Sequence, residues 1–424
     1  MNQNQRKKNT KSQTQTKSTP NQDWREGWAH IQYEQHPTTG VESCVCLWRN
    51  PLQGDSLYLP SMANAIRRTI LADLPSYLPS RQSTQFIDTT SVLHTDMLSQ
   101  RLHLCPVRME QLIQMEEPPT SLLIQANIQN QGSMIQNVYL KDLTVEGFEN
   151  PEDFWTNPNI LWTRLQPGQS LQMNSTLEFG TSHTKDSGFQ ACAAARYTFT
   201  TSEDVLEAMV QQNSDKLQTA EQIENFKNGH REQAVWRTQD GNPMEYVFQF
   251  DNLGAYPIQE VIPLACLIIE KRFLRMSQLL DRCLSILQEE GLDQYNKINI
   301  PDQIKVEPYS GEYNAFELTV YHENDTIMNE WTRKIRRDNR LEYIGYRMPH
   351  PQDPFAIVRI ALHNKPNELQ EYLKNSLTLM KEYADTIAQE WRGIREQYRD
   401  RSPVPSTPAW EDWIESHIYE IIHE

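Results

Sequence analysis

The chain has 424 residues, with 40 lysines and arginines against 56 aspartates and glutamates, so its formal net charge is −16. Binding to a nucleic-acid phosphate backbone needs a basic surface. The net negative charge therefore argues against an independent nucleic-acid-binding protein and favours protein partners. The length exceeds one ordinary core and predicts two or three domains. Six scattered cysteines form no framework of close pairs. The sequence has neither an apolar run of about twenty residues nor a signal-peptide core, so we expect a soluble intracellular protein.

The N-terminal residues 1–25 carry almost no apolar side chains, and such a segment cannot bury enough surface to offset the entropy of ordering. They predict a disordered basic tail. A tail that is simply exposed to solvent is favoured over a targeting or nucleic-acid-binding segment. Residues 28–59 predict strands, among them 42–48, where apolar residues partly alternate. Cys44 and Cys46 form a lone Cys-x-Cys without a second pair, so we predict no zinc and interpret both as strand residues.

The best-defined helix of the sequence covers residues 60–75. Ser61 can cap its first turn, and Pro75 cannot continue it. Arg67 lies at the edge of the apolar stripe and Arg68 nearly opposite it, which on a single amphipathic helix is most often a solvated face. The apolar residues that recur every four positions and form the stripe are Met62, Ile66, Ile70 and Leu74.

Three ordered blocks begin on this helix. Ala-Asn-Ala-Ile-Arg-Arg at 63–68 is followed by Thr-Ser-Val-Leu-His-Thr-Asp at 90–96 and Gln-Arg-Leu-His-Leu-Cys-Pro-Val at 100–107. They resemble the signature of the RNA polymerase α-subunit superfamily, which has an Asn-x-Leu-Arg-Arg helix, an Asn-Thr-Ser-Val-Leu segment and a His-Arg-Leu-Gly-Leu-Ile-Pro segment. The nearest relatives in style are the third-largest subunit of eukaryotic polymerase II and its archaeal counterpart. The four-cysteine zinc loop that many of these relatives carry is not recognisable here.

The resemblance implies that residues 26–118 and 241–291 are two parts of one dimerisation domain, separated by an inserted β-rich domain at 119–240. Blocks at 160–171 and 180–185 resemble the Leu-x-x-Gly-Gln-x-Leu and Gly-x-x-His-x-Lys blocks of that inserted domain.

Two further features fall within the inserted region. The polar, Gln- and Glu-rich stretch 201–236 predicts a helical excursion. His183 has no partner carboxylate or nucleophile at a recognisable spacing, so we interpret it as structural.

A long helix is predicted at 263–289, after a strand that begins near Met244. A seam of apolar residues runs along it at alternating steps of four and three, which is typical of packing between helices. The seam consists of Ile269, Phe273, Met276, Leu280, Cys283 and Leu287.

A linker is predicted at 292–306 and a second, smaller dimerisation domain at 307–397. Its strand 316–321 precedes a helix at 324–335, so the second unit weakly repeats the first. The repeat aligns Asn64 with Asn329, Ile66 with Trp331, Arg68 with Arg333 and Ile70 with Ile335.

The stretch 343–351, with Tyr346 and His350, resembles the Gly-Tyr-Lys-x-Pro-His-Pro-Leu turn of the eleventh polymerase II subunit, although Asn324 replaces the usual His of the preceding motif. Residues 398–424 are predicted only as a tail. The last long helix, 367–395, has a seam of Leu369, Leu373, Ser376, Met380, Tyr383, Ile387, Trp391 and Ile394.

The predicted fold class is α+β, with two α-subunit-type, ferredoxin-like dimerisation domains in one chain, as in fusions of large nucleocytoplasmic DNA viruses. The resemblance implies a non-catalytic assembly platform of a DNA-dependent RNA polymerase, working in the virion and host cytoplasm if viral. The implied partners are the largest and second-largest subunits and a small tenth-subunit-like protein. No cofactor, metal, membrane or direct nucleic-acid contact is expected.

Two residue sets follow from this interpretation. The helix pairs 61–74 with 263–289 and 325–338 with 367–395 are expected to pack together. Exposed guanidinium forks suit carboxylates and carbonyls of a partner. The partner-binding candidates are Asn64, Arg67, Arg68, Arg101, Arg333, Tyr346 and His350. The expected dimer seam is Ile66, Ile70, Ile269, Phe273, Met276, Leu280, Trp331, Ile335, Leu373, Met380 and Ile387.

The sequence leaves two other classes of function as alternatives. An enzyme would need a recognisable constellation, but the sequence has no Asp-x-Asp-Gly-Asp string, P-loop, His-Glu-x-x-His helix or Gly-x-Ser-x-Gly elbow. A structural virion protein with an α-like fold is the second alternative, and co-purification with large polymerase subunits would separate it from the polymerase interpretation.

Overall fold

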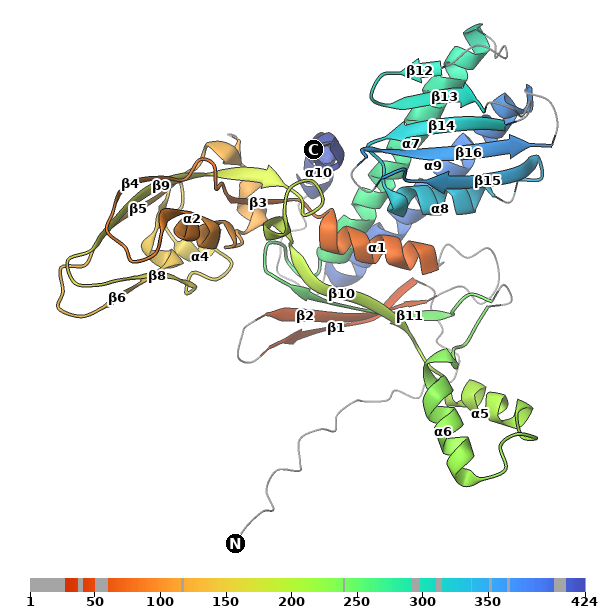
Figure 1. The fold of residues 1–424 in the computed structure, drawn as a ribbon, viewed down its shortest axis with the longest axis horizontal. Helices are drawn as coiled ribbons and strands as arrows, with labels where there is room; N and C mark the ends of the chain where they lie inside the picture. The colour runs from red at the N-terminus through yellow and green to blue at the C-terminus, as the bar shows by residue number, and fades with distance from the viewer. Residues whose placement is uncertain are drawn as a thin grey trace.

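The computed structural model describes residues 27–36, 41–49, 60–115, 118–238, 241–290, 298–309, 315–336, 338–350, 353–363, 367–399 and 409–423. The tail predicted at 1–25 lies outside these residues. The fold mixes antiparallel sheets with helices, which confirms the α+β character (Figure 1). Among the described residues, no helix is long and apolar enough to cross a membrane.

The first sheet is antiparallel in the order β1-β2-β11-β10. Its alternating residues point to one buried face, so Cys44, Cys46 and Trp48 are all covered. Trp48 stacks on Trp28 with ring centroids 5.4 Å apart. The strands are β1 (Gly27–Gln35), β2 (Glu42–Arg49), β11 (Glu245–Asn252) and β10 (Cys192–Phe199).

Helices α1 (Pro60–Ala72) and α7 (Val261–Glu290) complete what we call the first unit, and α1 contacts both β10 and α7. Proline suits the first position of α1 because its missing N–H has no helical partner there. Ser61 does not cap this helix as predicted. Its buried Oγ has no hydrogen-bond partner among the described residues.

A separate β-lobe, residues 76–189, projects from the first unit (Figure 1). Its main sheet has the order β3-β9-β5-β7, with β4 also paired to β9, and β6 pairs with β8. The strands are β3 (Ser76–Pro79), β4 (Gln85–Thr89), β5 (Leu123–Gln129), β6 (Gln136–Tyr139), β7 (Thr144–Val145), β8 (Leu161–Leu165) and β9 (Ser170–Gly180). The helices are α2 (Thr95–His103), α3 (Met109–Leu112) and α4 (Pro151–Phe154), with short 3-10 turns η1 (Pro119–Ser121), η2 (Leu140–Asp142) and η3 (Ser187–Phe189).

Strand pairing differs from the predicted domain boundaries. β3 and β4 fall in the predicted first dimerisation domain, 26–118, yet they pair with β9 of the β-lobe. β10 falls in the predicted inserted domain, 119–240, yet it pairs with β11 of the first sheet. The reason is that strand partners are chosen by contacts far apart in the chain, which local patterns do not encode.

Two helices, α5 (Glu203–Gln212) and α6 (Ala220–His230), followed by η4 (Arg231–Gln233), occupy the stretch predicted as a helical excursion. They project away from the sheets (Figure 1), and α6 has no buried residue.

The second unit is an antiparallel sheet in the order β12-β13-β14-β16-β15 with helices α8 and α9. The predicted linker at 292–306 is wrong for its C-terminal part, because β12 and β13 lie there and belong to this sheet. The elements are β12 (Ile298–Ile300), β13 (Ile304–Pro308), β14 (Ala315–Tyr321), α8 (Asp325–Ile335), β15 (Leu341–Arg347), β16 (Phe355–Leu362) and α9 (Asn367–Arg399).

The C-terminal tail contains a helix that the sequence did not reveal, α10 (Ala409–His423). It contacts α7 and buries Trp410 and Ile414. One hydrophobic cluster runs from Trp28 of β1 to Ile421 of α10, so the units share a continuous core.

The candidate functional site is the helical interface between the two units

Helices α7 and α9 lie together at the centre of the molecule and join the two units (Figure 1). The seam predicted along α7 is buried throughout, and so is the seam predicted along α9. Phe273 of α7 packs edge-on against Tyr383 of α9, with ring centroids 5.0 Å apart. The buried seam residues of the two helices are Ile269, Phe273, Met276, Leu280, Leu373, Met380 and Ile387.

The short helices α1 and α8 lie in corresponding places and also contact each other. Ile66 and Ile70 of α1 are buried, as are Trp331 and Ile335 at the aligned positions of α8. The burial of these aligned side chains therefore agrees with the internal repeat predicted from the sequence.

A buried ionic cluster lies where α1, α7 and the loop before α8 meet. Arg272 of α7 places Nη1 2.9 Å from Oδ2 of Asp73 and Nη2 2.8 Å from Oε2 of Glu323. Arg275 places Nη1 2.9 Å from the other oxygen of Glu323. Asp73 belongs to the first unit and Glu323 to the second, so one guanidinium holds a carboxylate from each.

The electrostatics of this cluster follow from its burial. Burial acts to lower the pKa of Arg272, but Glu323 and Asp73 more than reverse this, and the net pKa is raised. Removing one partner of such a cluster strands a buried charge. Arg272 thus pairs with one carboxylate from each unit.

Two further polar contacts tie α9 to the other helices. Trp391 donates its Nε1–H to Glu270 of α7 over 2.7 Å, and Tyr383 donates its hydroxyl to Glu330 of α8, also over 2.7 Å. Burial, together with the Glu330 carboxylate, raises the pKa of Tyr383 well above its usual value. Burial likewise raises the pKa of Glu270, which the Trp391 hydrogen bond partly offsets.

Two predicted partner-binding residues meet at the surface beside this interface. Burial and a hydrogen bond to the Asp325 carboxylate raise the pKa of Tyr346, while nearby Arg68 lowers it. Arg68, from α1, and Tyr346, from β15, are thus neighbours across the two units, and both are half-buried. Arg67 donates from Nε and Nη2 to Oδ1 of Asn64, at 3.1 and 2.9 Å.

The other predicted partner-binding residues lie apart. Arg333 of α8 and His350 after β15 are exposed. Arg101 sits in the β-lobe on α2, where its guanidinium donates to the carbonyls of Trp162 and Leu161 at 2.8 Å each. Its fork is therefore already engaged within the chain.

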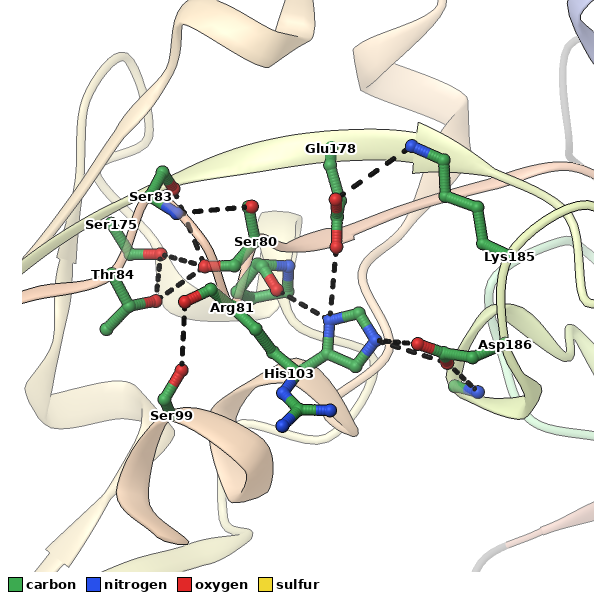
Figure 2. A network of polar contacts seen from close by, with 12 residues as sticks. Ser80, Arg81, Ser83, Thr84, Ser99, His103, Ser175, Glu178, Lys185 and Asp186 are labelled. Carbon is green, nitrogen blue, oxygen red and sulfur yellow. Dashed lines mark hydrogen bonds and ion pairs between the residues drawn. The ribbon is translucent and has the colours of Figure 1, made fainter. Parts of the chain in front are cut away.

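A second polar site lies in the β-lobe around His103, whose side chain is 3% exposed. Figure 2 shows its ring between Glu178 and Asp186. Nδ1 lies 2.8 Å from the carbonyl oxygen of Pro79, and Nε2 lies 3.2 Å from Oδ2 of Asp186. Both ring nitrogens thus lie against oxygen atoms of neighbouring elements.

A cleft of about 670 Å³ opens beside this network. Burial acts to raise the pKa of Asp186, but the backbone N–H of Gly188 and the His103 ring lower it, and the net pKa is below its usual value. Charges of both signs line the cleft, and the contacts of His103 with Pro79 and Asp186 tie β3, α2 and η3 together. The lining residues are Arg81, Gln82, Asp96, Ser99, Glu178, Lys185, Asp186 and Phe189.

The remaining candidate residues of the sequence are His183 and the cysteines. His183 is exposed, and its backbone N–H donates to the carbonyl of Ala72. All six cysteines are free and buried. Burial raises the pKa of the Cys105 thiol to about 12 and that of Cys46 well above its usual value, which disfavours the reactive thiolate form of both. No cluster of three or more histidine, cysteine or acidic side chains fit for a metal occurs among the described residues.

In this fold, paired helices that are buried over two sheets and joined by an ionic cluster hold the two units together. The RNA polymerase Rpb3/Rpb11 dimerisation domain matches residues 315–390, which run from β14 into α9. DNA-directed RNA polymerase II subunit rpb11 of Dictyostelium discoideum is 30% identical over 91 residues, covering 20% of this chain and 76% of that protein. The chain therefore belongs to the Rpb3/Rpb11 dimerisation-domain family.

A second relative agrees. The probable DNA-directed RNA polymerases I and III subunit RPAC2 of Caenorhabditis elegans is 28% identical over 111 residues, which is 25% of this chain and 76% of that protein. These findings confirm the predicted resemblance to α-like polymerase subunits. The two α-like halves in one chain, and a viral source, stay predictions.

Proposed function

We propose that this chain is an assembly subunit of a DNA-directed RNA polymerase, which contributes no catalytic residue and carries two α-like halves in one polypeptide. The observation that carries the proposal is the packing of α9 on α7. The module that matches the dimerisation domain, residues 315–390, is already paired inside the chain with a second helix-and-sheet unit. Its dimerisation surface is filled without a separate partner chain.

Linkage changes how such a pair forms. A partner held in the same chain acts at an effective concentration that reaches the millimolar range for short flexible linkers, so pairing does not depend on meeting another protein. The chain then offers both outer faces for larger subunits. We infer that the first unit docks the second-largest subunit, the second unit docks the largest, and a small tenth-subunit-like protein adds a further contact.

The half-buried surface of Asn64, Arg67 and Arg68, next to Tyr346, is our first candidate for the docking of the second-largest subunit. Guanidinium groups of this kind pair with carboxylates or carbonyls of a partner. The exposed Arg333 and His350 are the candidates on the second unit. Action in a virion and in host cytoplasm, if the source is a large DNA virus, is part of the same proposal.

The experiment is a pull-down of the tagged full chain from its native source, followed by identification of the co-eluting proteins. Wild type is compared with Arg67→Glu/Arg68→Glu and with a control of equal charge change, Arg164→Glu/Lys216→Glu, at exposed positions of the β-lobe and the α5–α6 hairpin. Circular dichroism verifies that all three are folded.

We expect wild type and the control to bring down both largest polymerase subunits, and the α1 variant to lose the second-largest. If wild type brings down no polymerase subunit, the α-like fold serves another use and the proposal is wrong. If the control loses the same subunit as the α1 variant, the general function stands but the assignment to α1 does not.

A further inference from the structure

The C-terminal helix α10 is held to the rest of the chain by side chains. Among the described residues, no backbone hydrogen bond joins it to another element. The nine residues before it, 400–408, include prolines at 403, 405 and 408. In Figure 1 α10 stands beside α7 on the side of the β-lobe, which matches its contacts.

The apolar stripe of α10 has the spacing of a helical ligand. Trp410, Trp413, Ile414 and Ile421 are buried, the last three standing three, four and eleven positions after the first. Trp410 packs against Tyr256 with ring centroids 5.2 Å apart. These are the anchors expected of an amphipathic helix packed on an apolar surface.

The receiving surface is aromatic and combines two parts of the fold. Trp413 packs against Phe179 of β9 at 5.8 Å and against Tyr77 of β3 at 6.4 Å between ring centroids. Tyr256, just before α7, completes the set of rings. We call Tyr77, Phe179 and Tyr256 the aromatic platform.

Charge is complementary around this platform. Residues 409–423 carry four acidic residues and no lysine or arginine. Glu415 pairs with Lys271 of α7 at 2.6 Å, and Glu411 pairs with Arg395 of α9 at 3.3 Å. Both acidic partners keep access to water, so each pair adds only modestly to the binding of the helix.

We propose that the aromatic platform and Lys271 form a binding site for an acidic, tryptophan-bearing amphipathic helix of a partner protein, and that α10 is its tethered, displaceable occupant. Binding of the partner helix frees α10 and with it the tie between the β-lobe and α7. The inference does not rest on the proposed function, because the site is defined without reference to a polymerase.

The first test measures binding of a fluorescently labelled peptide of residues 409–424 to two full-length chains. The wild-type chain has its site filled by α10, while Trp410→Ala/Trp413→Ala empties it without touching the platform. A tethered competitor acts at high effective concentration, so we expect the variant to bind the peptide about ten-fold or more tightly than wild type does. Equal binding by both chains, or binding by neither, overturns the proposal.

Specificity is tested on the same variant background. Adding Lys271→Glu should weaken the peptide's binding, and a peptide carrying Glu415→Lys should restore it. A peptide with both tryptophans replaced by alanine is the control and should not bind. Restoration failing, or the control peptide binding equally well, contradicts a site of this chemistry.

Hydrogen–deuterium exchange of the unaltered full chain gives an independent measurement. A displaceable α10 opens without unfolding the rest, so its amides should exchange faster than those of α7. In Trp410→Ala/Trp413→Ala, exchange should rise in α10 and stay unchanged in α7. If α10 and α7 exchange at one common rate, α10 is part of the core and not a displaceable ligand.

Discussion

The two units have the same arrangement of elements, but they differ in how continuous the chain is within each. Each has an antiparallel sheet, a short helix and a long helix, and α1 and α7 correspond to α8 and α9. The second unit is nearly continuous from β12 to α9, whereas the β-lobe and the α5–α6 hairpin interrupt the first. The β-lobe and the α5–α6 hairpin both join the first unit at the ends of strands and helices, where they leave the buried faces of α1 and α7 intact. Packing along the seam therefore constrains the helices, whereas the connections between elements tolerate insertions.

The largest effect is expected from removing the charge of Arg272, which pairs with one carboxylate from each unit. Arg272→Met removes the ion pair of Asp73 and leaves Glu323 paired with Arg275 alone. We expect it to lower the free energy of unfolding by about 3–5 kcal/mol, because buried carboxylates lose their partner. Urea denaturation measures this loss. Replacing all four residues of the cluster in Asp73→Leu/Arg272→Met/Arg275→Met/Glu323→Leu should recover most of it. A loss below about 1 kcal/mol for the single variant would contradict a buried cluster.

Truncating the seam tests whether the units melt as one body. Phe273→Ala removes the ring that packs on Tyr383 and should cost about 3–4 kcal/mol, because a cavity remains in a dense interior. In differential scanning calorimetry we expect one transition at a lower temperature. Two transitions, of which only one has moved, would show the units to be independent. Phe226→Ala on the projecting α6 is the control and should change little.

A smaller effect sharpens the comparison on the second unit alone. Tyr383→Phe removes the hydroxyl that donates to the buried Glu330. We expect it to lower the free energy of unfolding by about 1–3 kcal/mol, because the buried carboxylate oxygen then has neither this hydrogen bond nor one to water. Tyr343→Phe, at a side chain 55% exposed, is the matched control and should be neutral in the same denaturation experiment. Equal effects of the two substitutions would refute the role of Glu330.

The smallest expected effect lies at the end of α8. Arg340 lowers the pKa of the Asp338 carboxyl, which also accepts from Asn375 of α9 over 2.9 Å. The pair stabilises the fold above the unfolded pKa of about 3.9, and this contribution is lost as the pH falls through the lower folded pKa. Asp338→Asn should therefore cost less than about 1 kcal/mol at pH 7, and the difference from wild type should vanish in acid. A difference that persists in acid would assign the effect to packing.

Sequence periodicity could predict the helices and their buried seams, because a stripe such as Ile269, Phe273 and Met276 records helical geometry directly. The β-lobe and the short strands β12 and β13 were not delimited, since strand pairing depends on distant contacts and short strands lack a long apolar run. Arg272 was also missed. A charged residue on a helix usually marks a solvated face, and only the fold brings Asp73 and Glu323 to it.

The position of α9 on α7 bears on how the protein is made. Synthesis finishes α7 about a hundred residues before it finishes α9, and at about 5–20 residues per second the apolar stripe of α7 waits roughly 5–20 seconds for its cover. During that interval the nascent chain presents an uncovered hydrophobic helix to the ribosome's surroundings. Chaperone capture of the growing polypeptide should therefore peak after α7 emerges and fall once α9 is complete.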